Sequence, residues 1–498
     1  MAKIQKLGFW FFCLKFKKYG LSMNTVSSIA KNSMAMLSSE VLTKLITFSL
    51  TIILARYLGV LAFGQFSYLF ALVMLFEVMA DFGLDNLMIR EISQDKQKTK
   101  NLLSSVLTLK IITGFISFCA LFMFVFFFRK QDILIRSALL AGLAVFFHSL
   151  ANTFNSVFTA EERLDLKALF NIVAKLFLLV LIIITIKLNF GLFVVFGAFL
   201  SAEILRTIIG LYGCYKNFSV VALNFNLKTI KCLVKTTSSF ALISIISLIY
   251  FKIDIIMLSI LKSDQAVGWY NAAYGLFAAL LFIPESYCAS IFPVLSRYAI
   301  SDKEKLSFSW SRSVKYLIMV SVPIVVSVFI LNQRIITLFY SEAYIPSAAC
   351  LKILIFTIPW VFVNAINMRL LFACNQQKPA TVVALISLLL NVVFNFILIP
   401  KFSYLGASWA TLIVEIINVS IYFVLVSKIL GLKLKEFVIL AKIIFASVLM
   451  GVFIEFFKTS YLLFIILGAT ALYLFFIFKL HIIDKKDKEL FGQIKFKF

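Results

Sequence analysis

Charged residues are scarce in this sequence. Asp, Glu, Lys and Arg make up 14% of its 498 residues, whereas hydrophobic residues make up 62%. Soluble domains average about 25% charged and about 45–50% apolar residues. This balance excludes a soluble globular protein and indicates a polytopic membrane protein. The useful unit of length is then about 20 apolar residues for each crossing of the bilayer.

Cysteine and histidine are also rare, and neither forms a metal-binding pattern. The 7 cysteines are scattered without a Cys-x-x-Cys pair, and the 2 histidines are His148 and His481. We interpret the cysteines as small apolar residues within spans, and we expect neither disulfides nor zinc. His148 is expected to make a contact inside the helix bundle. No metal and no cofactor is predicted.

Two other absences narrow the function. No Gly-x-x-x-x-Gly-Lys-Ser/Thr loop occurs, which argues against direct ATP hydrolysis. No segment outside the apolar runs is long enough for a folded extramembrane domain. The net charge of +25 is therefore not gathered on a soluble basic face, and no nucleic-acid partner is expected.

What the sequence does have is a series of long apolar runs. They are too continuous for the roughly 10-residue alternating strands of an outer-membrane barrel. They predict an all-α polytopic membrane protein with about fourteen transmembrane helices, over residues 35–55, 62–81, 104–128, 134–157, 168–187, 191–214, 238–261, 268–292, 313–331, 348–372, 380–400, 405–427, 437–457 and 460–479.

The distribution of basic residues predicts the orientation. Lys and Arg outside the expected spans lie mostly on the side of the two termini, as in the cluster Lys96, Lys98 and Lys100. The opposite connections, such as RYLGVLA at 56–62, are short and poor in charge. By the positive-inside rule both termini are expected in the cytoplasm. Residues 1–22 leave two readings open: an interfacial amphipathic helix, or an extension ahead of a native start at Met23.

The two halves of the chain resemble each other. AFGQFSYLFALVMLF (62–76) is similar to AVGWYNAAYGLFAALLF (266–282), and FLSAEILRTII (199–209) is similar to TLIVEIINVSI (411–421). Each separation covers six predicted helices, so both copies would cross the membrane in the same sense. This indicates a parallel repeat with an axis along the membrane normal.

Several of these segments resemble a known family. ARYLGVLAFGQFSYLF (55–70), ADFGLDNLMIRE (80–91), YFKIDIIMLSILKSDQAVGWYNAAY (250–274), FPVLSRY (292–298) and NVVFNFILIPKFSYLGASWATLIVE (391–415) resemble segments of bacterial polysaccharide (O-antigen-type) flippases. The resemblance covers residues 24–430 in the order of that family. The family belongs to one superfamily with multidrug and toxic-compound extrusion proteins and lipid II flippases.

The resemblance implies two six-helix lobes and two extra C-terminal helices. The expected division is a cytoplasmic N-terminal segment 1–34, an N-lobe 35–214, a cytoplasmic linker 215–237, a C-lobe 238–427, two further helices in 428–479 and a basic tail 480–498. It also implies a transporter of undecaprenyl-diphosphate-linked oligosaccharide in the bacterial inner membrane, surrounded by membrane lipid. The sequence leaves open whether the protein associates with the polysaccharide polymerase and chain-length machinery.

Ionisable residues deep in the spans are the candidate functional residues, because each costs about 2.5–3.5 kcal/mol to insert. The expected cavity cations, suited to phosphate oxygens, are Lys44, Lys175, Arg206, Lys252 and Arg369. The expected coupling or ion-pairing residues are Glu40, Glu203, Asp254 and Glu415. Glu40–Lys44 and Glu203–Arg206 are spaced to close ion pairs on one helical face, which would equally well only hold helices together.

Lys252 and Asp254 are spaced differently. Two residues advance a helix by about 200°, so these two side chains point to opposite faces and cannot neutralise each other. We expect Lys252 to face a cavity, and Asp254 to pair with a neighbouring helix or to bind a proton or a cation. Lys110, Arg369 and Glu77 lie nearer to the expected helix ends and are expected to reach the membrane interface.

Two other functions remain open. A multidrug exporter of the same architecture would favour an aromatic, acidic cavity. A membrane-embedded polysaccharide polymerase or glycosyltransferase would need a long outer loop, and the first outer loop here is very short.

The charge distribution makes a prediction about topology. Single cysteines at Ser263 and Ser403, in a cysteine-free background, should react with an impermeant thiol reagent added outside the cell. Cysteines at Ser93 and Ser301 should react only after the membrane is permeabilised. The reverse pattern of labelling would overturn the orientation.

Overall fold

The computed structural model describes residues 23–129, 131–218, 245–246, 248–431, 437–484 and 487, with side chains described from Val41 onward. Residues 1–22, most of the predicted linker 215–237, most of the tail and the side chain of Glu40 lie outside the described part. The chain divides into two compact units, which are considered separately. Residues Gly59–Ser67 and the residues from Tyr250 onward form the second unit, and the rest of the N-terminal half forms the first.

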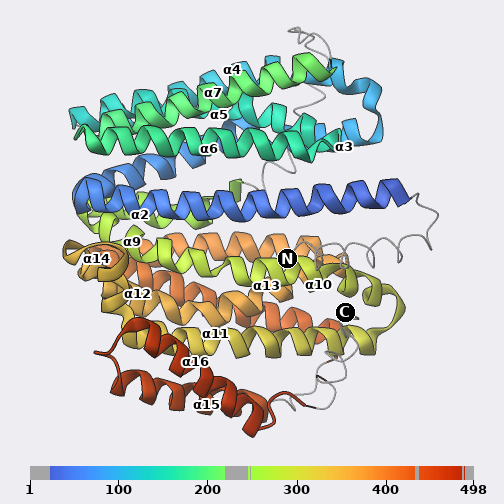
Figure 1. The fold of residues 1–498 in the computed structure, drawn as a ribbon, viewed down its shortest axis with the longest axis vertical. Coiled ribbons are helices and arrows are strands. Elements are labelled where there is room, and N and C mark those ends of the chain that lie inside the picture. Colours follow the sequence, from blue (N-terminus) through green and yellow to red (C-terminus); the bar gives the residue numbers. More distant parts are fainter. Residues whose placement is uncertain are drawn as a thin grey trace. The chain divides into compact units, whose positions relative to one another are not determined.

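The first unit is a bundle of long helices (Figure 1). Its elements are α2 (Met23–Asp81) apart from Gly59–Ser67, α3 (Leu84–Gln94), η2 (Lys96–Lys98), α4 (Thr99–Phe128), α5 (Asp132–Ala160), α6 (Leu164–Lys187) and α7 (Leu192–Phe218). Helix α5 packs against both α4 and α7. Close approach is possible because Gly142 of α5 faces Phe118 of α4, and Gly210 of α7 faces Phe154 of α5.

Helical residues 248–261 follow, and from Tyr250 onward they belong to the second unit, together with Gly59–Ser67. This unit continues with α9 (Asp264–Leu280), α10 (Phe282–Ser301), α11 (Lys303–Phe339), η3 (Glu342–Tyr344), α12 (Pro346–Leu354), η4 (Ile355–Thr357), α13 (Ile358–Ala373), α14 (Gln377–Leu430), α15 (Phe437–Phe456) and α16 (Leu462–Lys479). Helix α11 packs against α12, α13 and α15. The described residues thus contain helices and no strand, which confirms the all-α prediction.

Within the described residues, 11 helices are long and apolar enough to cross a membrane. Helix α2 continues through the first expected loop, interrupted only by Gly59 at φ 70° and ψ 175°. Helix α14 likewise spans two predicted helices and is interrupted at Ser403, at φ 53° and ψ −132°. The predicted loops were therefore single-residue kinks. Helix α3, a short amphipathic helix that follows Gly83, was not predicted.

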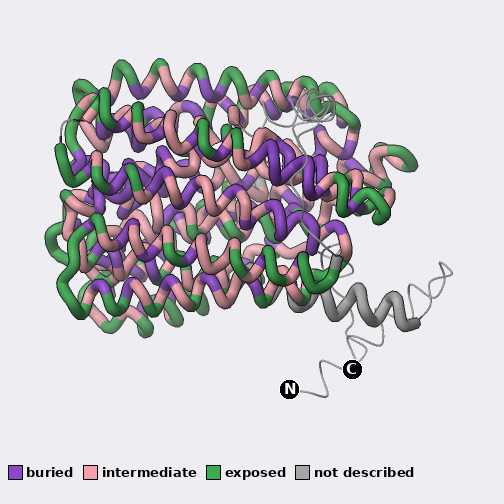
Figure 2. Tube along the Cα trace, turned by 90° about the horizontal axis from the view of Figure 1, so that it is seen from above, coloured by how far each residue is buried: buried purple, intermediate pink, exposed green. Residues whose placement is uncertain are grey.

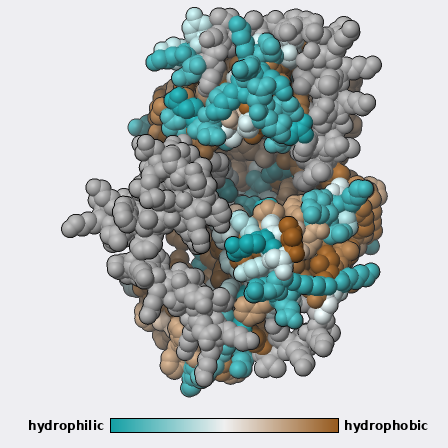
Figure 3. Space-filling model, turned by 90° about the vertical axis from the view of Figure 1, so that its right-hand side faces the viewer, coloured by the Kyte–Doolittle hydropathy of each residue, from teal (hydrophilic) through white to brown (hydrophobic). Residues whose placement is uncertain are grey.

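The outer faces of the helices are apolar. Exposed residues lie along the outward turns, as Figure 2 shows. Many of them are large and hydrophobic, such as Phe127 (70% exposed) and Phe456 (80% exposed). Such a surface would be an aggregation liability in water and is expected in lipid. Polar surface gathers instead at the end of the first unit that carries α3 and η2 (Figure 3), where Lys98 lies near Glu91 and Lys96 near Glu161.

Asp484 and Asp487, near the C-terminus, form ion pairs with basic residues of α11. Asp487 is fully buried, and its carboxylate accepts hydrogen bonds from Lys315 Nζ at 2.5 Å, Tyr316 Oη at 2.7 Å and Arg312 Nη1 at 2.9 Å. Asp484 lies 2.6 Å from Arg312 Nη2. These two carboxylates therefore neutralise two cations of α11.

The segment Gly59–Ser67 interlocks with α9 in a reciprocal way. A Cβ at Gly64 would lie 1.6 Å from the carbonyl oxygen of Asp264, and a Cβ at Gly268 would lie 2.2 Å from that of Val60. Asn271 Nδ2 donates to Ser67 Oγ at 2.7 Å, across a sequence separation of 204 residues. Each helix thus uses its own glycine to admit the backbone of the other.

The interlock predicts that Gly64→Ala destabilises the protein. The added methyl group meets a backbone oxygen that no rotamer change can move, so we expect a loss of about 1–3 kcal/mol or more. Thermal unfolding of the purified protein in detergent measures this loss as a lower Tm. Gly191→Ala is the matched control, because a Cβ there has open space. Equal Tm values for the two variants would show that the interlock is not tight.

Candidate functional site

A closed ring of polar side chains lies inside the first unit. His148 Nε2 lies 2.9 Å from Glu77 Oε1, and His148 Nδ1 lies 3.1 Å from Glu203 Oε2. Arg206 Nη1 donates to Glu203 Oε2 at 3.1 Å, and Arg206 Nη2 donates to Asn152 Oδ1 at 2.7 Å. Asn152 Nδ2 lies 3.3 Å from Glu77 Oε1 and closes the ring.

Helical spacing brings these groups together. His148 and Asn152 are four residues apart on α5, and Glu203 and Arg206 are three residues apart on α7, so each pair occupies one face of its helix. Glu77 reaches them from α2. Arg206 also lies over the ring of Phe170 of α6, 5.4 Å from the ring centre. Four helices of the first unit thus contribute to one site.

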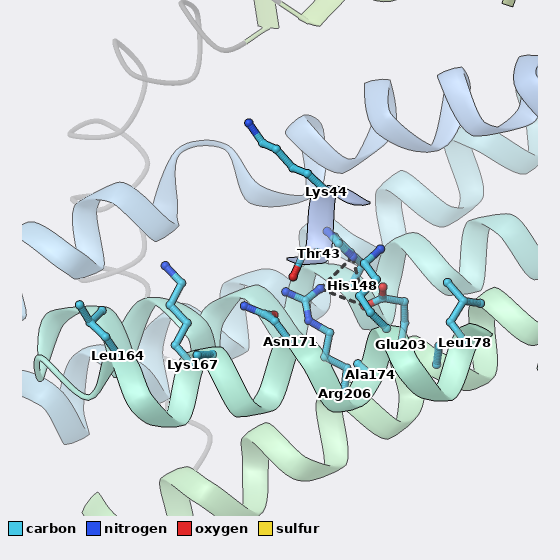
Figure 4. Close-up of a pocket in the computed structure, with 13 residues that line it drawn as sticks. Thr43, Lys44, His148, Leu164, Lys167, Asn171, Ala174, Leu178, Glu203 and Arg206 are labelled. Atoms are coloured by element: carbon cyan, nitrogen blue, oxygen red, sulfur yellow. Dashed lines mark hydrogen bonds and ion pairs between the residues drawn. The ribbon is translucent and has the colours of Figure 1, made fainter. Parts of the chain in front are cut away.

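The ring forms part of the wall of a cavity of about 480 Å³. Figure 4 shows Arg206, His148 and Glu203 together at its inner wall, with Lys44 and Lys167 extending toward the open space. The lining residues are Thr43, Lys44, His148, Leu164, Lys167, Ala168, Asn171, Ala174, Lys175, Leu178, Ala202, Glu203 and Arg206. The lining therefore carries three lysines and an arginine against one carboxylate.

Helix α6 gives the cavity its length. Lys167, Asn171 and Lys175 recur every four residues and so line one face of this helix. The lining runs from Leu164, at the first residue of α6, to Leu178. That is a distance of about 21 Å at the helical rise of 1.5 Å per residue.

The structure thus brings Lys44, Lys175, Arg206 and Glu203 to one cavity. Arg206 is engaged by the ring, whereas Lys175 has no hydrogen bond or ion pair with any residue that the structure describes. A cation in a cavity without a fixed partner is suited to an anionic ligand.

The predicted acidic residues of the second unit are held differently. Asp254 is buried, and its carboxylate accepts from Asn395 Nδ2 at 2.5 Å, Tyr270 Oη at 2.8 Å and Thr411 Oγ1 at 3.1 Å. Glu415 is also buried.

The carboxylate of Glu415 accepts hydrogen bonds from Tyr250 Oη at 2.5 Å and Asn364 Nδ2 at 2.9 Å. Among the described residues, neither Asp254 nor Glu415 forms an ion pair. Neutral donors thus satisfy their oxygens without cancelling their charge.

The basic candidates of this unit lie apart from these carboxylates. Lys252 is half-buried and forms no hydrogen bond or ion pair with the part of the chain that is described. The guanidinium of Arg369 lies 6.0 Å from the ring centre of Phe292, a cation–π distance. Lys252 and Arg369 belong to the second unit, whereas the residues that line the cavity all belong to the first.

Lys110 was wrongly expected to reach the membrane interface. Lys110 is fully buried, with Nζ 2.7 Å from Asp85 Oδ1, 2.9 Å from Asp81 Oδ1 and 3.2 Å from the Ser149 carbonyl oxygen. Glu77 is part of the polar ring. The useful signal in the sequence was the motif DFGLD at 81–85, because its two carboxylates require a cation within the bundle.

Comparisons with known proteins agree with this architecture. The family described as "Polysaccharide biosynthesis protein" matches residues 29–299, and the family described as MatE matches residues 240–397. The chain is 26% identical over 371 residues to the "Probable low-salt glycan biosynthesis flippase Agl15" of Haloferax volcanii. This match covers 72% of this chain and 75% of the relative.

Solved structures show the same fold. The lipid II flippase MurJ in an inward closed conformation superposes with a TM-score of 0.70 at 18% identity, over 90% of this chain and 98% of the other. An inward-facing multidrug resistance MATE transporter superposes with a TM-score of 0.65 at 15% identity, over 80% and 98%. At these identities the likeness establishes the fold alone.

Lys110→Met tests the ion pairs that buried Lys110 forms with Asp81 and Asp85. The variant leaves Asp81 and Asp85 without their shared cation, and breaking a buried ion pair typically costs about 3–5 kcal/mol. We expect a clearly lower Tm and a lower yield of folded protein in detergent. Lys98→Met is the control, because Lys98 is 50% exposed and pairs only at the surface. A Lys110→Met protein as stable as the control would show that the ion pairs of Lys110 do not stabilise the protein.

Proposed function

Because this chain belongs to the polysaccharide biosynthesis protein family, we propose that it is a flippase for undecaprenyl-diphosphate-linked oligosaccharides. The chain is a multi-pass membrane protein with the fold of the multidrug and lipid II exporters, and it is a transporter and not an enzyme. The proposed direction is from the cytoplasmic to the outer leaflet, for the biosynthesis of a surface polysaccharide of the O-antigen or capsule type. The proposed location is the bacterial inner membrane, with both termini in the cytoplasm.

The basic cavity of the first unit is the observation that carries this proposal. A polyprenyl tail can stay in lipid during transport, whereas a diphosphate and its sugars need a polar path. Lysine and arginine give strong hydrogen bonds to phosphate oxygens. The cavity begins at the first residue of α6, which is the cytoplasmic end of this helix in the proposed orientation, and continues to Leu178, over 15 of its 24 residues. Asn171 lines the cavity as well; its Oδ1 accepts from Asn155 Nδ2 at 3.1 Å, and its Nδ2 is proposed to donate to sugar hydroxyls.

The same charges disfavour a drug exporter. Organic cations would be repelled by a wall on which Lys44, Lys167, Lys175 and Arg206 outnumber Glu203. The match to the MatE family is compatible with this reading, since it concerns the architecture shared by both kinds of transporter.

The proposed architecture has fourteen spans in two lobes related by a parallel repeat, with two additional helices. Support comes from the two kinked helices, each long enough for two crossings, and from helical residues 248–261, which add one more to the 11 candidates. The reciprocal contacts of Gly64 with Asp264 and of Gly268 with Val60 pair positions that the repeat makes equivalent. Transport would proceed by alternating access.

Lys252 and Arg369 are proposed as cations of the second lobe that contact the same diphosphate. Asp254 and Glu415 are proposed as coupling residues, because a buried carboxylate that no cation neutralises can gain a proton or a cation during the cycle. The contacts of Asp254 and Glu415 with neutral donors support this role.

Depletion of the protein in its native cell tests the function directly. We expect lipid-linked oligosaccharide to accumulate in the cytoplasmic leaflet and surface polysaccharide to disappear. Unchanged surface polysaccharide and no accumulation would refute the proposal.

Complementation then tests the cations. Lys175→Gln and Lys252→Gln should reduce surface polysaccharide at least tenfold at normal membrane abundance, whereas Lys175→Arg and Lys252→Arg should keep partial activity. Lys98→Gln is the matched control at the surface. Wild-type transport by both glutamine variants would show that these cations do not contact the substrate.

A further inference from the structure

We propose that His148 is a proton-binding site, and that its proton decides whether Arg206 stays in the wall or turns to an anion in the cavity. The proposal rests on the proposed function only in taking that anion to be a diphosphate. The main support for the proposal is that one ring nitrogen of His148 has two partners that it cannot bind at the same time.

The competition takes place at Nδ1. This atom lies 3.1 Å from Glu203 Oε2 and 3.1 Å from Arg206 Nη1. With a proton on Nδ1, His148 donates to Glu203 and cannot accept from Arg206. Without that proton, Nδ1 accepts a hydrogen bond from the guanidinium. The two protonation states therefore require different partners.

The other nitrogen keeps its role in both states. His148 Nε2 lies 2.9 Å from Glu77 Oε1, and a carboxylate accepts a hydrogen bond from a ring N–H. The proton on Nε2 is therefore retained, and gain or loss of charge is confined to Nδ1. The imidazole is held between carboxylates of two helices, α2 and α7, so it does not need to rotate when it titrates.

The charges around the ring favour a linked exchange. Glu77 faces His148 from α2, Glu203 and Arg206 face it from α7, and Lys175 of α6 lines the same cavity wall. On the α4 side, Lys110 donates to the carbonyl oxygen of Ser149. It also forms ion pairs with the carboxylates of Asp81 and Asp85.

These charges set the cost of releasing Arg206. If Arg206 left a neutral His148, two carboxylates would remain in the wall without a direct cation, and that is costly at this depth. If His148 is an imidazolium, both carboxylates keep a charged partner. Arg206 can then turn to the cavity and donate to an anion.

Linkage makes the relation reciprocal. If the proton strengthens anion binding tenfold, the anion strengthens proton binding tenfold. The His148 titration midpoint is then expected to rise by about one pH unit when an anion saturates the cavity.

The chain allows this to be measured at a single atom. It has 2 histidines, so His481→Asn leaves His148 as the only one. Asparagine suits position 481, where the backbone has φ 52°. The protein, labelled with ¹⁵N-histidine in lipid nanodiscs, is titrated by NMR, and the ring ¹⁵N shifts distinguish Nδ1 from Nε2. Inorganic diphosphate is the probe of the cavity.

We expect Nε2 to keep its proton throughout, Nδ1 to titrate, and diphosphate to raise the midpoint of Nδ1. Arg206→Gln should remove the diphosphate effect. Arg206→Lys, which keeps the charge if the glutamine variant does not fold, should retain a smaller one. Lys98→Gln should behave as the parent protein.

Three results would overturn the proposal: no titration of Nδ1, loss of the proton from Nε2 in its place, or a midpoint that diphosphate leaves unchanged. Failure of the proposed function is a separate outcome. Depletion of the protein would then cause no accumulation of lipid-linked oligosaccharide, whatever the NMR titration shows.

Discussion

A charge buried in a bundle that lipid surrounds is costly unless a partner compensates it, and the main polar clusters of this protein provide such partners. The outer faces carry large apolar side chains, whereas Lys110, Asp254 and Glu415 are buried inside the units. The resulting clusters hold helices in register. In the proposed function, the cluster that lines the cavity of the first unit would also contact the head group of the substrate.

The two units meet this need in different ways. In the first unit, carboxylates lie against cations: Asp81 and Asp85 against Lys110, and Glu203 against Arg206. In the second unit, hydroxyl and amide groups donate to Asp254 and Glu415. The carboxylates of the first unit are thus neutralised by cations. Asp254 and Glu415 of the second unit can change charge without breaking an ion pair among the described residues. This difference supports the proposal that Asp254 and Glu415 of the second unit act in coupling.

Hydropathy alone was enough to predict the fold class and most of the spans, because lipid imposes the same length on every crossing. It did not distinguish a loop from a kink at Gly59 or Ser403, since both leave the same polar gap between apolar runs. The spacing of Glu203 and Arg206 correctly predicted their ion pair. The parts played by His148, Asn152 and Glu77 depend on how three helices pack, and no spacing within one helix contains that information.

The ion pairs that Asp484 and Asp487 form with α11 have a consequence for membrane insertion of the chain. Asp487 is 172 residues from Lys315, and it leaves the ribosome about 10–30 s later at ordinary rates of synthesis. During that interval Arg312 and Lys315 remain unneutralised at one end of α11. In the proposed orientation they would retain that end in the cytoplasm while later helices insert. The same two side chains would thus first act as a topological signal during translation, and become a structural contact only after Asp487 has been synthesised.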